Sequence, residues 1–176
     1  MKRVLLCGVA CMLAAMAVTA ASAREVPRVG LDIPVRVGPP AETGPTTLAM
    51  VLAAYGADSV VLKRTREAYD PVTQTSSIEA LEALAKKLGY DARIATPGYD
   101  SLLILLGQGI PPILCIEPLA GSLGKQRYMV IANADTRGRR YLAMDGRPFS
   151  TLLYAKVIAS VWNTRDGRAL LVTPRK

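Results

Sequence analysis

Residues 43–55 form a run that is apolar almost all the way round, and this run limits the folds open to the chain. Thr43 is a residue type favoured at helix starts, Pro45 suits a first helical turn, and Gly56 suits a helix end. A helix with apolar side chains on every side is stable only when other elements cover all of it. The sequence therefore predicts a buried central helix over residues 43–55.

A second helix is predicted over residues 76–88. Ser76 followed by Glu79 has the spacing of a capping box, and Gly89 provides a C-terminal stop. The apolar residues of this segment recur on one face only. The pattern indicates a peripheral helix.

The rest of the chain predicts short helices and strands. Asp100 and Ser150 are expected to cap helices over residues 100–106 and 150–161. Strands are predicted within residues 24–38, where Ile33, Val35 and Val37 share one side, and over residues 90–96, 113–117, 128–134, 140–144 and 169–173. Residues 135–139 have turn-like composition, so the two strands that flank them are expected to form an antiparallel hairpin. The predicted class is α+β, with N-terminal helices packed on a mainly antiparallel sheet.

The N-terminus has the three parts of a secretory signal peptide. Lys2 and Arg3 precede an apolar run over residues 4–18, and small residues lead to Ala23. Cleavage after Ala23 would leave residues 24–176 as one domain, secreted or periplasmic. An uncleaved membrane anchor is the alternative, because the run is close to the length that spans a bilayer. A lipoprotein signal is less favoured, since neither Cys7 nor Cys11 follows the required pattern.

Cysteine usage and charge restrict the partners of the mature chain. Cleavage would remove Cys7 and Cys11 and leave Cys115, so no internal disulfide could form. The formal charge of +8 falls by two when Lys2 and Arg3 are removed. Because the remaining basic residues are scattered along the sequence, ordinary surface solvation is favoured over nucleic-acid binding.

The central helix also carries a motif. Residues 43–56 read T-G-P-T-T-L-A-M-V-L-A-A-Y-G. This resembles the nucleophile helix of family 39 of the cysteine peptidases, the papain-like enzymes that trim double-glycine leaders from bacteriocins. Their motif is Cys-Gly-Pro-x-x-Leu-x-Met-x-x-x-x-Tyr-Gly, and every anchor except the first is present.

The resemblance continues in order over about residues 31–174. It includes the segments 77–81, 85–89, 102–112, 126–131, 143–146, 149–162 and 169–174. The helix motif is moderately specific, and the later segments are persuasive because all of them occur in sequence order. The resemblance implies a papain-like peptidase fold.

The departures from this family fall on its catalytic positions. By the resemblance, Thr43 occupies the nucleophile position, Arg127 the histidine position, Val37 the oxyanion-hole position and Asp145 the position of the acid. A papain-like mechanism needs a thiolate, a histidine that takes its proton and an oxyanion donor. Only Asp145 fits its role, and the chain contains no histidine at all. We therefore expect a pseudoenzyme.

Other chemistry has little support in the sequence. A threonine nucleophile needs an adjacent base, which Arg127 cannot supply, so Thr43 is expected to be a helix-start residue. Cys115 lies in an apolar run and is expected to be buried and inert rather than catalytic. No carboxylate cluster has the spacing of a calcium loop, and no glycine-rich phosphate loop follows a strand. No metal or cofactor is expected.

Arg127 and Asp145 could pair where the histidine and the acid would have paired, or could be two solvated charges. The favoured function is an inactive peptidase-like binding module. Its groove, with Thr43, Gly44, Arg127, Tyr128 and Asp145 as candidate contacts, would hold an extended peptide or a partner from a secretion or assembly system. The resemblance includes inactive peptidase-like domains of toxin exporters, which dock substrate polypeptide. The alternatives are a hydrolase with an unconventional nucleophile and a structural or inhibitory partner of an active peptidase.

Overall fold

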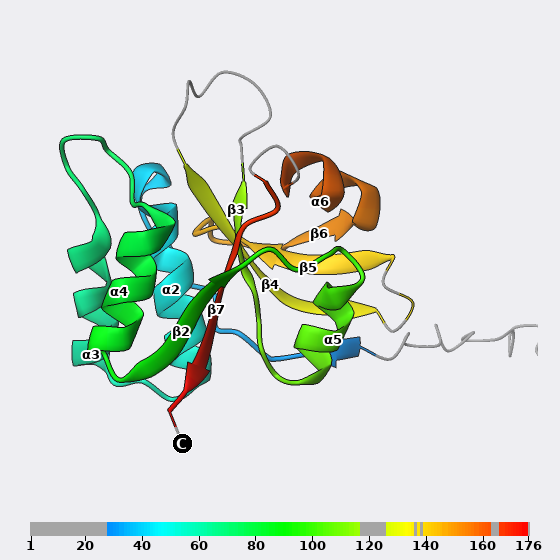
Figure 1. Ribbon diagram of the computed structural model, residues 1–176, viewed down its shortest axis with the longest axis horizontal. Helices are drawn as coiled ribbons and strands as arrows, with labels where there is room; N and C mark the ends of the chain where they lie inside the picture. The colour runs from blue at the N-terminus through cyan, green and yellow to red at the C-terminus, as the bar shows by residue number, and fades with distance from the viewer. Residues whose placement is uncertain (1–27, 117–125, 136, 138, 163–165, 176) are drawn as a thin grey trace, which may run out of the picture.

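A seven-stranded sheet separates two groups of helices in the computed structural model, which describes residues 28–116, 126–135, 137, 139–162 and 166–175 (Figure 1). The helices are α2 (Thr43–Ala54), α3 (Ser59–Arg64), α4 (Ile78–Lys87), α5 (Ser101–Gly107) and α6 (Ala155–Trp162), with 3-10 turns η2 (Pro40–Glu42) and η3 (Thr65–Ala68). The strands are β1 (Arg28–Gly30), β2 (Tyr90–Ala95), β3 (Ile113–Ile116), β4 (Arg127–Asp135), β5 (Arg140–Met144), β6 (Thr151–Tyr154) and β7 (Ala169–Pro174).

The sheet has the order β2-β7-β3-β4-β5-β6, and β1 pairs with β4 beside this path. All the pairings among the described strands are antiparallel. Helices α2, α3 and α4 lie on one side of the sheet, and α5 and α6 lie on the other (Figure 1). The predicted α+β class and the hairpin between β4 and β5 are confirmed.

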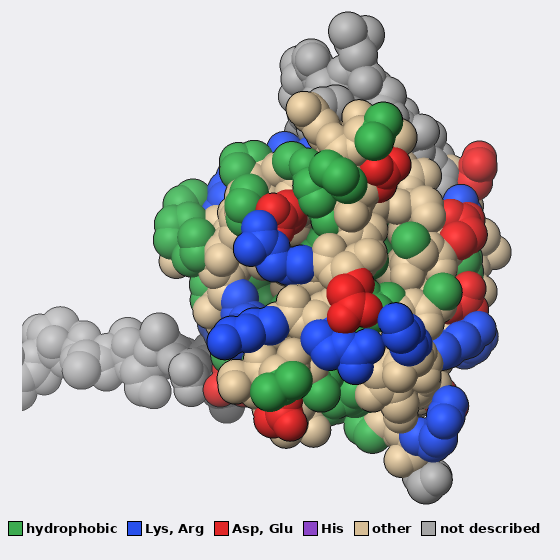
Figure 2. Space-filling view, turned by 90° about the vertical axis from the view of Figure 1, so that its left-hand side faces the viewer, with side chains coloured by type: hydrophobic (Ala, Val, Ile, Leu, Met, Phe, Trp, Pro, Cys, Tyr) green, Lys and Arg blue, Asp and Glu red, His purple; other side chains and the backbone are tan. Residues whose placement is uncertain are grey.

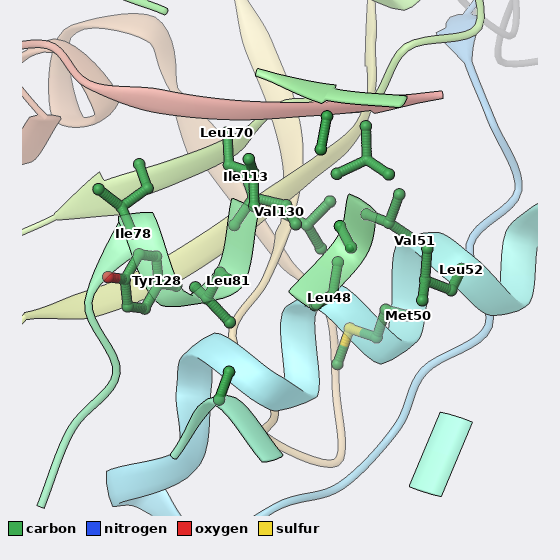
Figure 3. Close-up of a cluster of buried hydrophobic side chains, with 14 of the residues drawn as sticks. Leu48, Met50, Val51, Leu52, Ile78, Leu81, Ile113, Tyr128, Val130 and Leu170 are labelled. Atoms are coloured by element: carbon green, nitrogen blue, oxygen red, sulfur yellow. The ribbon is translucent and has the colours of Figure 1, made fainter. Parts of the chain in front are cut away.

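Strand β4 is buried on both faces, which explains its continuous apolar sequence. Tyr128 and Val130 face a cluster built with α2 and α4, whereas Met129 and Ile131 face a cluster built with α5 and α6. An irregularity in the pairing with β5 between Ile131 and Asn133 shifts the register beyond this point. Figure 3 shows the first cluster, in which side chains of α2 and α4 point toward those of the sheet.

Helix α2 is the buried central helix that the sequence predicts. Leu48, Met50, Val51 and Leu52 are all fully buried. Tyr55 follows the last turn, and its hydroxyl lies 3.0 Å from the carbonyl oxygens of both Gly109 and Val172. The sheet thus holds the C-terminal end of the helix as well as its side chains.

The predicted start of the second helix is wrong by one residue. Helix α4 begins at Ile78, and Ser77 is its cap, because the Ser77 hydroxyl accepts a hydrogen bond from the Ala80 amide at 3.0 Å. Ser76 is instead buried, its hydroxyl has no hydrogen-bond partner, and its carbonyl oxygen accepts a bond from the Tyr128 hydroxyl at 2.7 Å. Contact with the sheet therefore decides which serine caps the helix.

Two further predictions are wrong in part. Residues 151–154 form β6 rather than the start of a helix, because β5 offers a strand with which to pair. Within residues 24–38, the described strand is limited to β1, and Val35 and Val37 are exposed while Ile33 is buried. Residues 24–27 and the proposed signal segment 1–23 lie outside the described residues.

The helical surface opposite the sheet has mixed charge. Figure 2 shows this side, which carries α3 and α4, with Lys and Arg side chains beside carboxylates. Lys86 lies 2.7 Å from Glu82, and Arg64 lies 2.8 Å from Glu67. Such a mixture of signs is typical of an ordinary solvated face. In the part of the chain that the structure describes, no helix has the length and apolar character needed to cross a membrane.

Candidate functional site

Thr43 is the first residue of α2, and its side chain is buried against β4. The Thr43 hydroxyl oxygen accepts a hydrogen bond from the Tyr128 backbone amide at 3.1 Å. No side-chain bond caps the helix; η2 leads directly into it, so Thr43 is a helix-start residue as predicted but not a cap. Its hydroxyl joins the helix to the sheet.

Gly44 allows this close approach of helix and sheet. A Cβ atom on Gly44 would lie 3.0 Å from the Tyr128 ring and 3.1 Å from the Leu81 side chain. Tyr128 is fully buried, and Figure 3 shows its ring beside Leu81 and Ile78 of α4. The glycine of the motif therefore has a packing role that does not depend on catalysis.

Arg127 begins β4, and Asp145 directly follows β5. The Arg127 Nη2 atom lies 4.0 Å from Asp145 Oδ2, at the outer limit of an ion pair. A second arginine is closer, because Arg147 Nε lies 2.9 Å from Asp145 Oδ1. The guanidinium of Arg147 also lies 5.4 Å from the centre of the Phe149 ring. One carboxylate thus faces two cations, and only the more distant of them was identified from the sequence.

The sequence contains a signal from which the contact of Arg147 with Asp145 could have been predicted. Arg147 lies two residues after Asp145 across a glycine, and the Arg147 amide is within 3.4 Å of the Asp145 carboxylate. Gly146 has φ of +93°, a conformation that turns the chain sharply at this point. The Asp-Gly-Arg sequence is therefore a local turn that brings the arginine back to the acid.

Val37 lies in the irregular segment before η2. The Gly38 amide donates a hydrogen bond to the Gly146 carbonyl oxygen at 3.1 Å, which ties this segment to the turn that follows Asp145. The Val37 side chain itself is 69% exposed. An isopropyl group has no hydrogen-bond donor, so it could not stabilise an oxyanion.

A pocket of about 200 Å³ lies beside the first turn of α2. Its lining includes Arg36, Val37, Gly38, Pro45, Lys63 and Arg66, but neither Thr43 nor Asp145. Glu42 forms one wall, and its buried carboxylate accepts bonds of 2.6 and 2.8 Å from Arg66. The bond to Glu42 raises the pKa of Arg66 above its ordinary value. The pocket therefore includes the aligned oxyanion-hole position, Val37, but none of the positions of the nucleophile, the histidine or the acid.

The structure brings the five predicted groove residues together, but it gives them different roles. Thr43, Gly44 and Tyr128 are buried, whereas Arg127 and Asp145 remain partly exposed. Cys115 is buried in β3, as predicted, and it lies on the face that packs against α2 and α4. The described residues include no group of three or more His, Cys, Asp or Glu side chains placed to hold a metal ion.

Comparisons with known proteins give structural matches only. No protein-family model matches the chain, and no curated protein sequence matches it. The peptidase domain of Streptococcus ComA, a bifunctional ABC transporter of a quorum-sensing pathway, is 22% identical with a TM-score of 0.64. That match covers 84% of this chain and 99% of the domain.

Two other matches have the same architecture. A double-glycine-motif protease from an AMS/PCAT transporter, solved with its leader peptide, is 18% identical with a TM-score of 0.64 and covers 85% of this chain and 97% of that one. The C39-like domain of a toxin secretion ATP-binding protein from Vibrio parahaemolyticus is 16% identical with a TM-score of 0.52, over 76% of this chain and 96% of that domain. This chain has the papain-like fold of C39 peptidase domains.

Proposed function

We propose that this protein is a catalytically inactive, exported peptidase-like module that binds an extended peptide segment of a secretion or assembly partner. The observation that carries the proposal is the state of Thr43. Its hydroxyl is buried at the nucleophile position and accepts a bond from the Tyr128 amide, while Arg127 and Asp145 occupy the positions of the histidine and the acid. Arg127 stays protonated and cannot take a proton from an alcohol, and the carboxylate of Asp145 is paired with Arg147 and lies at the limit of an ion pair with Arg127.

The absence of histidine supports inactivity independently of any alignment. Cysteine and serine peptidases of this kind use an imidazole as base and then as acid, and the sequence of 176 residues has no histidine. The Val37 side chain adds no oxyanion donor, and Cys115 is enclosed in the core. A hydrolase with an unconventional nucleophile therefore has no specific observation in its favour.

Peptide binding draws support from what the fold retains. One structural neighbour was solved in complex with a leader peptide, which shows that this fold can hold such a segment. Main-chain hydrogen bonds and side-chain pockets bind extended peptides without catalytic residues. In this chain the accessible contacts would be Arg127, Arg147 and the pocket beside Val37. The buried residues Thr43, Gly44 and Tyr128 would hold α2 and β4 in position beneath these contacts.

The test combines binding and cleavage. A fluorescent double-glycine leader peptide is titrated with the protein by anisotropy, and the same mixture is examined for cleavage by mass spectrometry. We expect saturable binding without cleavage, weakened by Arg127→Glu with Arg147→Glu. Arg93→Glu on β2 is the control that changes charge away from the site. No binding above the level of a scrambled peptide would overturn the proposal.

Chemical probes separate the proposal from the hydrolase alternative. A fluorophosphonate and iodoacetamide are applied to the protein and to Thr43→Ala and Cys115→Ala variants. Labelling or leader cleavage that disappears in either variant would show an enzyme. Export is tested separately, by sequencing the N-terminus of the protein recovered from outside the cytoplasm; we expect it to begin at Arg24.

A further inference from the structure

Four arginines gather at one end of the β4–β5 hairpin, away from the aligned catalytic positions. Arg137 and Arg139 lie between the two strands, and Arg140 begins β5. Arg28 of β1 stands opposite Asp135 at the end of β4. A pocket of about 260 Å³ opens here, and it is lined by Asp135, Tyr154 and the three arginines of the hairpin.

Among the described residues, the ion pair of Asp135 with Arg140 is the one formed by the arginines at this end. Asp135 is nearly buried and already accepts a bond from the Arg139 amide at 2.9 Å, and Arg140 Nε lies 3.4 Å from it. Among the residues that the structure describes, Arg28, Arg137 and the Arg139 side chain form no ion pair, and all three are exposed. Several guanidinium groups are therefore available to an anionic ligand.

Exposed apolar side chains border the arginines. Tyr154 stands directly opposite Arg140 in the β5–β6 ladder and is 61% exposed. Leu152 lies two residues earlier on the same face of β6 and is 52% exposed. The cluster that α2 and α4 cover reaches Leu142 and Met144 of β5 but neither of these β6 side chains. Cationic and apolar groups thus share one surface.

The position of this surface relates it to the N-terminal segment. Strand β1 and the end of the hairpin lie side by side in Figure 1, as their pairing requires. In the sequence, nine residues separate Arg28 from the apolar run over residues 4–18. Nine residues of extended chain span at most about 32 Å. A segment of the chain that enters a bilayer during export would therefore bring this end of the domain close to the lipid surface.

We propose that this surface, defined by Arg28, Arg137, Arg139, Arg140, Leu152 and Tyr154, binds the anionic phospholipids of a membrane. Guanidinium groups form paired hydrogen bonds with phosphate, and an anionic leaflet attracts each basic residue near it. Tyrosine is enriched at membrane interfaces because its ring is apolar and its hydroxyl is polar.

The test measures binding of the full chain to vesicles. Cosedimentation is compared between phosphatidylcholine vesicles and vesicles that also contain phosphatidylglycerol, for the natural protein and for Arg137→Gln with Arg139→Gln. We expect the double variant to lose about fivefold in affinity per arginine on anionic vesicles and to match the natural protein on neutral ones. The preference for anionic vesicles should also weaken in high salt.

The matched control is Arg93→Gln with Arg175→Gln. These arginines lie on β2 and just after β7, at the opposite edge of the sheet, and their loss changes the net charge by the same amount. Tyr154→Ser is expected to weaken binding while leaving the charge unchanged. Equal losses in the control and the hairpin variant, or no loss in either, would overturn the proposal. The same variants are also tested for binding to DNA. If the hairpin variant loses affinity for DNA but not for vesicles, the proposal is overturned in favour of nucleic-acid binding.

Discussion

The hydroxyl of Thr43 accepts a hydrogen bond from the backbone amide of Tyr128, 85 positions later in the chain, at 3.1 Å. This bond joins the first residue of α2 to the central strand β4. Both side chains are buried, so water cannot replace either partner without a change in structure. The position that holds a nucleophile in the resembled family thus has a structural role in this protein.

Replacement of Thr43 by valine should destabilise the fold. The variant keeps the shape of the side chain but removes the oxygen that accepts the hydrogen bond of the buried Tyr128 amide, and loss of such a buried bond costs about 1–3 kcal/mol. Thr43→Ser retains the hydroxyl oxygen, so its stability should be closer to that of the natural protein. Urea denaturation measures both, and a Thr43→Val variant as stable as the natural protein would show that the bond contributes nothing.

The two arginines near Asp145 should contribute unequally to stability. Arg147 is the closer partner and Arg127 lies at 4.0 Å, so a double-mutant cycle should give a larger coupling for Asp145 with Arg147. Because both arginines are partly exposed, the larger coupling should not exceed about 1 kcal/mol. Charge reversal at Arg127 with no loss of thermal stability would count against an ion pair with Asp145.

Gly44→Ala should destabilise the protein, because the added methyl group would press on the buried Tyr128 ring and on Leu81. Overpacking of this kind costs about 1–3 kcal/mol. Gly107→Ala is the matched control, since no atom lies within 4 Å of the added methyl group at the end of α5. That substitution should be neutral or stabilising by up to about 1 kcal/mol. The midpoint of thermal unfolding should therefore fall for Gly44→Ala, and it should stay the same or rise for Gly107→Ala.

The two serines before α4 should respond differently to alanine. Ser77→Ala removes the cap bond to the Ala80 amide and should cost about 1 kcal/mol. Ser76→Ala removes a buried hydroxyl that has no hydrogen-bond partner, so it should be neutral or stabilising. The reverse order in denaturation experiments would restore Ser76 as the cap.

Stability should fall in alkaline solution in a way that depends on Tyr55. Burial raises the pKa of Tyr55 from 10.0 to about 12. A group whose folded pKa is raised contributes stability that is complete below pH 10 and is lost as the pH rises toward 12. Urea melts of the natural protein and Tyr55→Phe between pH 9 and pH 12 should therefore converge with rising pH. A difference that stays constant across this range would contradict the shift.

Local patterns predicted most elements because their cause is local. The apolar run of α2, the periodicity of α4 and the turn between β4 and β5 each depend on residues close in sequence. Predictions failed where a distant element competed with a local signal. Residues 151–154 start with a capping-type serine before them, yet pairing with β5 makes them a strand.

The site, like the fold, has some features that the sequence states directly and others that depend on distant residues. The identities of Thr43, Arg127 and Asp145, and the lack of any histidine, are properties of the sequence. Their spatial relationship is not, because Arg147 lies closer to Asp145 than Arg127 does, and Arg66 holds Glu42 across 24 positions. Ion-pair partners depend on side-chain directions that periodicity does not describe.

By itself, the sequence determined that the chain forms an α+β domain around one buried helix, and that no imidazole is present for catalysis. Only the tertiary structure decided that the Thr43 hydroxyl accepts a hydrogen bond from β4, that Ser77 rather than Ser76 caps α4, and that four arginines meet at one end of the sheet. The physical reason is that hydrogen bonds and charge contacts act over a few ångströms in space, and folding brings together residues that the chain separates by tens of positions.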